Sequence, residues 1–265
     1  MREFDRSDAA RALLRWYVDA GVDEAVDAEP VDRFQPEASV RPAPPARTAT
    51  ASVTHIARPA QPSADEAIAR AAAAAAACNS HDELAAAVAA FEGCPLKAGA
   101  RNTVFSDGVP GARLLVIGEA PGRDEDALGK PFVGRAGQLL DKMLAAIGRS
   151  RATDTLISNV VYWRPPGNRA PTQAEIAACR PFVERLIELT QPAAIMLAGG
   201  VPTQAMIGAS GIMRARGAWR DVTLASGAAF PALPVFHPAF LLRQPAQKRL
   251  AWTDLQTLAA RLRDA

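Results

Sequence analysis

Cysteine is scarce in this chain, which has only three, an odd number with no closely spaced pair. Small secreted domains that depend on disulfides usually carry an even number of cysteines, so we do not expect a disulfide framework. The N-terminal segment MREFDRSDAARALLRWYVDAG also lacks the apolar core of a signal peptide. These two absences predict a cytoplasmic protein.

Long hydrophobic runs and a strong net charge are also absent. No apolar run approaches the roughly 18 residues that a membrane-spanning helix needs, so we expect no membrane association. The formal net charge is +2, which by itself neither favours nor excludes nucleic acid. The chain has 265 residues, of which 49% are hydrophobic. It can therefore bury a substantial core, and we expect one main domain with an appendage, acting as a monomer.

The N-terminal part differs in composition from the rest. Residues 1–27 have the pattern of an amphipathic helix, which could pack on the main domain or dock on another protein. Residues 28–62 are rich in proline and alanine and have few large apolar side chains. Because such a segment cannot offset the entropy of ordering, it is predicted to be a linker. The main domain is predicted over residues 63–265, beginning with an alanine-rich helix at 63–77.

Short apolar runs alternate with helical patterns in the main domain. The runs, each predicted to be a strand, lie at 114–117, 156–161, 193–198 and 233–236. Strands that alternate with helices indicate a parallel sheet covered by helices on both faces. We therefore predict an α/β fold, a three-layer α/β/α sandwich with a four-stranded, mainly parallel central sheet.

The segment from Leu114 to Met143 organises the candidate site. The first predicted strand ends at Gly118 and is followed by a polar loop that carries Glu119, Glu125 and Phe132. In an open α/β sheet, ligands bind beyond the carboxyl ends of the strands, which is where this loop must lie. A solvated loop position remains the alternative for any single acid.

The second predicted strand carries an asparagine and leads into a basic loop. Asn159 lies within an apolar run, where an amide without partners costs a few kcal/mol, so it either closes a loop or binds a ligand. The following sequence RPPGNR, from Arg164 to Arg169, is rigid and basic. Such a loop suits a phosphate backbone or another anionic ligand.

The fourth predicted strand ends next to a histidine. His237 is the only histidine between residues 91 and 252, and both a structural and a catalytic role are open for it. Leu241 and Leu242 follow, with Arg243 next to them. Large apolar side chains beside cations suit a wedge that enters a base stack while phosphates are held. The alternative is that both leucines are core residues at the start of a helix.

Taken together, these segments resemble a known family. GEAPG, followed by ED and then GKPFVGRAGQLL, is similar to the first motif of the family 4, iron–sulfur type, uracil-DNA glycosylases. NVV with RPPGNR resembles the second motif, and HPAFLLR resembles the third, in the same order. The resemblance covers residues 91–252. It implies a monofunctional enzyme that flips uracil out of DNA and hydrolyses its N-glycosidic bond, leaving an abasic site.

The resemblance also implies roles for individual residues. Asn159 would pair with the O4/N3 edge of uracil, Phe132 would stack on the base, His237 would donate toward O2, and Glu119 would lie near the sugar. The implied catalytic residues are Glu119, Asn159 and His237. The implied uracil-binding residues are Ala120, Glu125, Phe132, Asn159 and Asn168. The implied DNA-binding residues are Arg164, Arg169, Leu241, Leu242 and Arg243.

The chain departs from the family at the positions of its metal ligands. Members of the family hold a four-iron, four-sulfur cluster with four cysteines. Here the corresponding positions are Phe91, Cys94, Trp163 and Cys179, so aromatic residues replace two ligands. We therefore expect no cluster and no other cofactor or metal, and predict that the two aromatic side chains fill the vacated volume.

The missing ligands and the long N-terminal extension motivate an alternative. The chain could be a non-catalytic protein that binds uracil in DNA, abasic DNA or a protein partner on a glycosylase fold. A third reading is excision of other deaminated bases. Substitution of Asn159 or His237 separates the first two, because an enzyme loses turnover whereas a pure binding protein has none to lose.

Overall fold

The computed structural model describes Arg11 and residues 63–264. The chain divides into two units, Met1–Ile56 and Ala57–Ala265, and the fold below is that of the second. Apart from Arg11, the predictions for residues 1–27 and 28–62 fall outside the described residues. No helix in the described part of the chain is long and apolar enough to span a membrane.

A mixed six-stranded sheet forms the centre of the fold. From edge to edge its strands are β1 (Ser106–Gly108), β3 (Thr155–Asn159), β2 (Leu114–Gly118), β4 (Ala194–Ala198), β6 (Ala229–Val235) and β5 (Arg220–Thr223). The inner strands pair in parallel, and the two edge strands pair antiparallel to their neighbours. The prediction of four strands is therefore wrong. The edge strands escaped notice because their sequences, SDG and RDVT, contain no apolar run.

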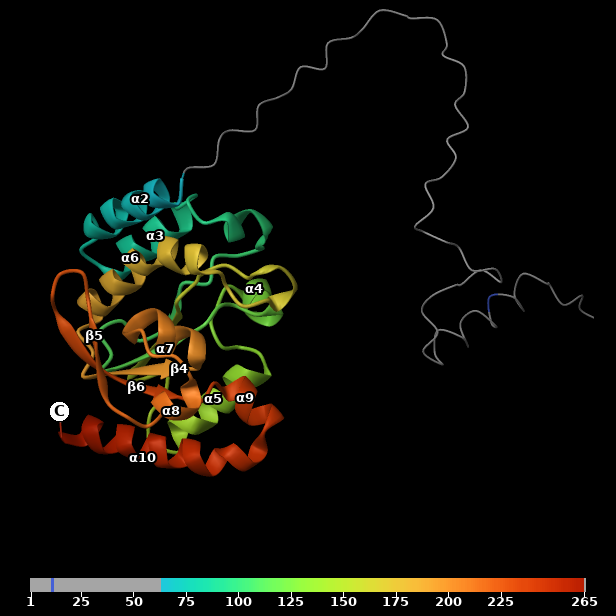
Figure 1. Ribbon diagram of the computed structural model, residues 1–265, viewed down its shortest axis with the longest axis vertical. Coiled ribbons are helices and arrows are strands. Elements are labelled where there is room, and N and C mark those ends of the chain that lie inside the picture. The colour runs from blue at the N-terminus through green and yellow to red at the C-terminus, as the bar shows by residue number, and fades with distance from the viewer. Residues whose placement is uncertain (1–10, 12–62, 265) are drawn as a thin grey trace, which may run out of the picture. The chain divides into compact units, whose positions relative to one another are not determined.

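Helices cover both faces of this sheet (Figure 1). They are α2 (Ala64–Ala76), α3 (His81–Ala90), α4 (Arg123–Leu128), α5 (Arg135–Ala145), α6 (Gln173–Thr190), α7 (Gly200–Ile207), α8 (Ile212–Ala215), α9 (Pro238–Arg243) and α10 (Lys248–Asp264). Short 3-10 turns lie at Pro95–Gly99, Pro166–Asn168 and Pro245–Gln247. The predicted alanine-rich helix is α2, where Ser63 and Glu66 form a capping box.

Alternation along β2 explains how one strand serves two cores. Leu115 and Ile117 pack in the core that includes residues of α2, α3 and α6, whereas Leu114 and Val116 pack in the core that includes residues of α5 and α10. All residues of β2 are buried, as expected for an inner parallel strand covered on both faces. The register places Gly118 opposite Asn159, so the carboxyl ends of β2 and β3 lie side by side.

Candidate active site

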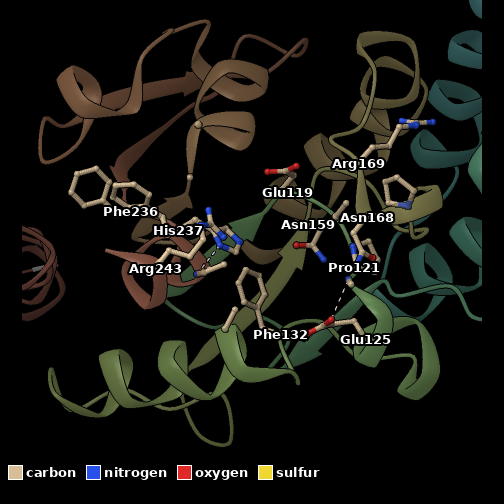
Figure 2. A pocket seen from close by; sticks show the side chains of 18 of the residues that line it. Glu119, Pro121, Glu125, Phe132, Asn159, Asn168, Arg169, Phe236, His237 and Arg243 are labelled. Atoms are coloured by element: carbon tan, nitrogen blue, oxygen red, sulfur yellow. Dashed lines mark hydrogen bonds between the residues drawn. The ribbon is translucent and has the colours of Figure 1, made fainter. Parts of the chain in front are cut away.

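A cavity of about 650 Å³ lies at the carboxyl ends of the parallel strands. Glu119 follows β2, Asn159 ends β3, and His237 follows β6, and Figure 2 shows these side chains around one space. The structure thus brings together residues that are 118 positions apart in the chain. The predicted site residues that line the cavity are Glu119, Ala120, Glu125, Phe132, Asn159, Asn168, Arg169, His237 and Arg243.

Asn159 presents an amide without a protein partner on its oxygen. The residue is 1% exposed, and its Oδ1 has no hydrogen-bond partner among the described residues. A buried acceptor without a partner costs free energy, so it marks a place where a ligand can donate. The neighbouring Gly118 is needed for this arrangement, because a Cβ there would collide with Asn159 Oδ1 and with the Phe132 ring.

Phe132 holds its ring beside the histidine in an unusual backbone conformation. Its φ is +54°, in the left-handed region that non-glycine residues seldom occupy. The Phe132 and His237 ring centroids are 5.6 Å apart, with 30° between the ring planes. A base between the two rings would need about 7 Å, two van der Waals contacts. The two rings are therefore too close together, as they lie here, for a base to insert between them.

Glu125 lines the cavity, and its carboxylate also organises the polar loop. Its Oε1 accepts hydrogen bonds from the backbone N–H groups of Val133 and Gly134, both at 2.9 Å. Its Oε2 accepts from the N–H of Gly122 at 3.1 Å, at the start of α4. Three backbone donors thus occupy this carboxylate, and they tie the two ends of the polar loop together. Figure 2 shows Glu125 at the cavity with one of these bonds as a dashed line.

Glu119 is half-buried at the cavity, and burial raises the pKa of its carboxyl group. Desolvation has this effect because it disfavours the charged form. A carboxyl group whose pKa lies above the usual range can change protonation state closer to neutral pH. Such a group is suited to positioning water or to stabilising a developing positive charge.

His237 is a neutral hydrogen-bond donor. It caps α9, where its Nδ1 accepts from the backbone N–H of Ala239 at 3.1 Å. Burial, with a smaller contribution from the positive charge of Arg243, lowers the pKa of His237 to about 4. The ring is therefore neutral at physiological pH, and because Nδ1 accepts, the proton resides on Nε2. A neutral N–H next to the cavity can stabilise negative charge that develops on a ligand.

The basic loop after β3 is held largely by its own interactions. Arg164 donates through Nε to Asn168 Oδ1 at 2.7 Å, and Asn168 has a left-handed φ of +54°. Arg169 forms two hydrogen bonds with the buried Glu175, at 2.9 and 2.6 Å. Glu175 also accepts from the N–H of Thr172 at the start of α6. Both arginines therefore already have intramolecular partners, and Arg164 does not line the cavity.

The two leucines after His237 differ in exposure. Leu241 is 1% exposed and packs in the core, so its side chain does not reach the surface in this structure. Leu242 is 38% exposed, and Arg243 next to it lines the cavity. Both leucines belong to α9, as the alternative reading supposed, and successive helical residues point in different directions. Only Leu242 remains available as a wedge.

Comparison with known proteins agrees with this geometry. Residues 105–256 match the family described as the uracil DNA glycosylase superfamily. The chain belongs to the uracil DNA glycosylase superfamily. This confirms the family that the three motifs indicated.

Several relatives carry the name type-4 uracil-DNA glycosylase. The relative from Archaeoglobus fulgidus is 36% identical over 184 residues, which is 68% of this chain and 92% of that protein. The relative from Thermotoga maritima is 35% identical over 165 residues, covering 62% of this chain and 84% of that protein. The relative from Pyrobaculum aerophilum is 36% identical over 167 residues, with 61% and 84% covered.

The positions at which the family resemblance implied cluster ligands are packed with aromatic rings. Phe91 stacks on Trp163 with ring centroids 6.4 Å apart and contacts Phe182 edge-on at 5.1 Å. The indole N–H of the fully buried Trp163 donates to Thr103 Oγ1 at 3.0 Å. This filled volume does not suit a cluster that needs four thiolates.

The remaining thiols at that position are buried as well. Contact with Cys94, together with burial, raises the pKa of Cys179 well above its usual range, and the same contact lowers the pKa of Cys94. The pair therefore favours one thiolate rather than two. Within residues 63–264, no group of three or more His, Cys, Asp or Glu side chains could hold a metal ion.

One wall of the cavity, formed by residues directly after β4, was not predicted from the sequence. Gly199, Gly200 and Ile212 line it, and a Cβ on Gly199 would lie 3.1 Å from the Cβ of His237. Gly199 has a φ of +110°, which favours glycine. The available signal was the Gly-Gly pair directly after the third predicted strand, at the same edge of the sheet as the other site residues.

Proposed function

We propose that this protein is a monofunctional uracil-DNA glycosylase of base-excision repair, which flips uracil out of DNA and hydrolyses its N-glycosidic bond. The observation that carries the proposal is the buried amide of Asn159 at the wall of a cavity with a neutral histidine donor. The oxygen of this amide has no hydrogen-bond partner within the part of the chain that the structure describes. Membership of the superfamily and the names of the relatives support it.

In this proposal Asn159 recognises the base. Uracil presents an N3–H donor beside its O4 acceptor, which complements the oxygen and the N–H₂ of one carboxamide. Cytosine presents the inverse pattern at these two positions. A site built for one pattern leaves polar groups unpaired with the other, and this is a strong basis for discrimination. Ala120 and Asn168 would complete the uracil-binding pocket.

Phe132, His237 and Glu119 would promote bond cleavage. The Phe132 ring stacks on the flipped base. His237 donates through Nε2–H toward O2, where negative charge grows as the uracil anion departs. Glu119, when ionised, stabilises the electron-poor sugar or orients the attacking water. Glu125 acts indirectly, by holding the loop that carries Phe132.

On the DNA side, we place the contact at the rim of the cavity. Leu242 would enter the base stack while Arg243 holds a phosphate. Arg243 forms no ion pair with any residue in the described part of the chain, in contrast to Arg169. Arg164 and Arg169 would hold the basic loop in a conformation that fits the DNA backbone, and would contribute less to binding the phosphates directly. The catalytic domain would extend over residues 63–265.

We further propose that the enzyme works without an iron–sulfur cluster, and that Phe91 and Trp163 hold the loops that the cluster joins in relatives. Iron and sulfide would be measured in protein purified without air. Stoichiometric iron would contradict this part of the proposal.

The test of the function is strand cleavage after alkali on a labelled duplex that bears one uracil opposite guanine. We expect cleavage with the wild-type protein and its loss in Asn159→Ala. Binding without cleavage would instead favour a non-catalytic protein that recognises uracil or abasic DNA. Duplexes with hypoxanthine or xanthine in place of uracil would show whether other deaminated bases are substrates.

A further inference from the structure

The left-handed backbone of Phe132 requires a restraint. A φ of +54° is unfavourable for a side chain as large as phenylalanine, so surrounding contacts must hold it. Gly137 supplies part of the space, because a Cβ there would collide with the carbonyl group of Phe132. Space alone permits the conformation without fixing it.

Arg151 supplies the restraint. Its Nη2 donates to the carbonyl oxygen of Phe132 at 2.8 Å, and its Nη1 donates to the carbonyl oxygen of Pro131 at 2.9 Å. The two branches of one planar guanidinium thus bind two successive carbonyl groups. These two carbonyl groups belong to the peptide planes on either side of the Phe132 Cα, so the pairing restrains the orientation of both planes.

Carboxylates on two other elements fix Arg151 in turn. Asp107 of β1 accepts from Nη1 at 3.0 Å, and Asp141 of α5 accepts from Nε at 2.8 Å. The Arg151 side chain is 17% exposed, so these contacts are less screened by solvent than a surface pair. Lys130 lies 3.3 Å from the other oxygen of Asp107. Three segments of the main domain therefore converge on one guanidinium.

We propose that Arg151 is a positioning residue for the glycosylase reaction, which acts through Phe132 and sets the ring plane on which the flipped base stacks. This inference rests on the proposed function. Arg151 does not line the cavity, so it does not touch the substrate. Its effect on the reaction passes through the backbone of the residue that does.

The experiment is a double-mutant cycle on single-turnover uracil excision with Arg151→Ala and Phe132→Ala. In the wild-type background, Arg151→Ala should lower the excision rate by roughly tenfold to a hundredfold, because misplaced groups cost this much. In the Phe132→Ala background the same substitution should change the rate by less than about twofold, since the group through which it acts is gone. Equal losses in both backgrounds would overturn the proposal.

Two further variants separate positioning from stability. Arg149→Ala is the matched control, because Arg149 is also largely buried and pairs with Asp154 and the carbonyl of Leu262, yet does not contact Phe132. It should leave the excision rate of the folded protein unchanged. Arg151→Lys should restore only part of the rate, because one ammonium group cannot reproduce the planar fork. Full restoration by lysine would contradict the two-carbonyl restraint.

Hydrogen exchange on the free protein distinguishes this proposal from the proposed function. The N–H groups of Val133 and Gly134, which donate to Glu125, should exchange faster in Arg151→Ala than in Arg149→Ala. This measurement needs no activity. If the wild-type protein excised no uracil, the proposed function would fail, and unchanged exchange at these amides would overturn the restraint separately.

Discussion

Two sites lie close together along the same stretch of chain, and they are built in opposite ways. Asn159 ends β3 with an amide oxygen that has no partner, whereas Trp163, four residues later, is fully buried with its indole N–H bonded. The first site keeps a polar atom unsatisfied, at a cost to stability. The second, where the family resemblance implied cluster ligands, is closed by packed rings. The buried hydroxyl of Tyr162, which packs on Trp163, also has no partner among the described residues, but only Asn159 lines the cavity. The contrast therefore agrees with the proposal that the first site binds a ligand.

The largest expected effect is the loss of stability when an aromatic side chain is removed from the packed site. Trp163→Ala is expected to lower the free energy of unfolding by about 3–5 kcal/mol, the usual cost of removing a buried tryptophan. Urea unfolding would measure it. Trp252→Ala is the control, because Trp252 is 43% exposed. If the variant remained as stable as wild type, the aromatic rings would not be what holds this region together.

The open site should show the reverse pattern. Asn159→Ala is expected to lower uracil excision on the order of a hundredfold to a thousandfold, as for other removed transition-state contacts. The free energy of unfolding should stay within about 1 kcal/mol of wild type or rise, because a buried acceptor without a partner disappears. Single-turnover kinetics and urea unfolding on the same preparation would show the split. A large loss of stability would mean that Asn159 is structural.

The protonation of Glu119 provides a third test of the open site. Burial raises the pKa of this carboxyl group in the folded protein, so stability from its protonated form is complete below its unfolded pKa of 4.5 and declines as pH rises through the folded pKa. Glu119→Gln should therefore be more stable than wild type at pH 7 and equal to it near pH 4. Thermal unfolding at both values checks the sign. The opposite order would mean that the native carboxylate has a favourable partner.

The smallest expected effect is on the excision rate, when Leu242 at the rim of the cavity is truncated. Leu242→Ala should lower excision from duplex DNA by roughly tenfold, because a wedge offsets part of the cost of unstacking, and should affect single-stranded DNA less. Leu128→Ala, which removes a side chain that is 67% exposed and does not line the cavity, should change neither rate. Equal losses on both substrates would argue against a wedge.

Local signals in the sequence predicted part of this architecture and could not predict the rest. The inner strands were readable because each is an apolar run, and their carboxyl ends located Glu119, Asn159 and His237. The edge strand Arg220–Thr223 has no such pattern, because pairing with β6 rather than burial defines it.

Contacts between side chains and distant parts of the chain could not be predicted from the sequence either. The resemblance placed Glu125 in the pocket, but only the folded loop shows that three backbone amides occupy its carboxylate. The separation of Leu241 from Leu242 depends on how α9 is rotated against the core. The contacts of Arg151 join residues from β1 and α5, which no local pattern connects.

The edge strands have a consequence for behaviour at high concentration. An exposed, regular edge can pair with the edge of another molecule and start aggregation. Here β1 has only three residues and ends at Gly108, whose φ of +122° turns the chain away from a regular strand. The other edge, β5, carries the exposed charges of Arg220 and Asp221. Both edges therefore offer a poor template for further strands, which favours a protein that stays dispersed while it searches DNA.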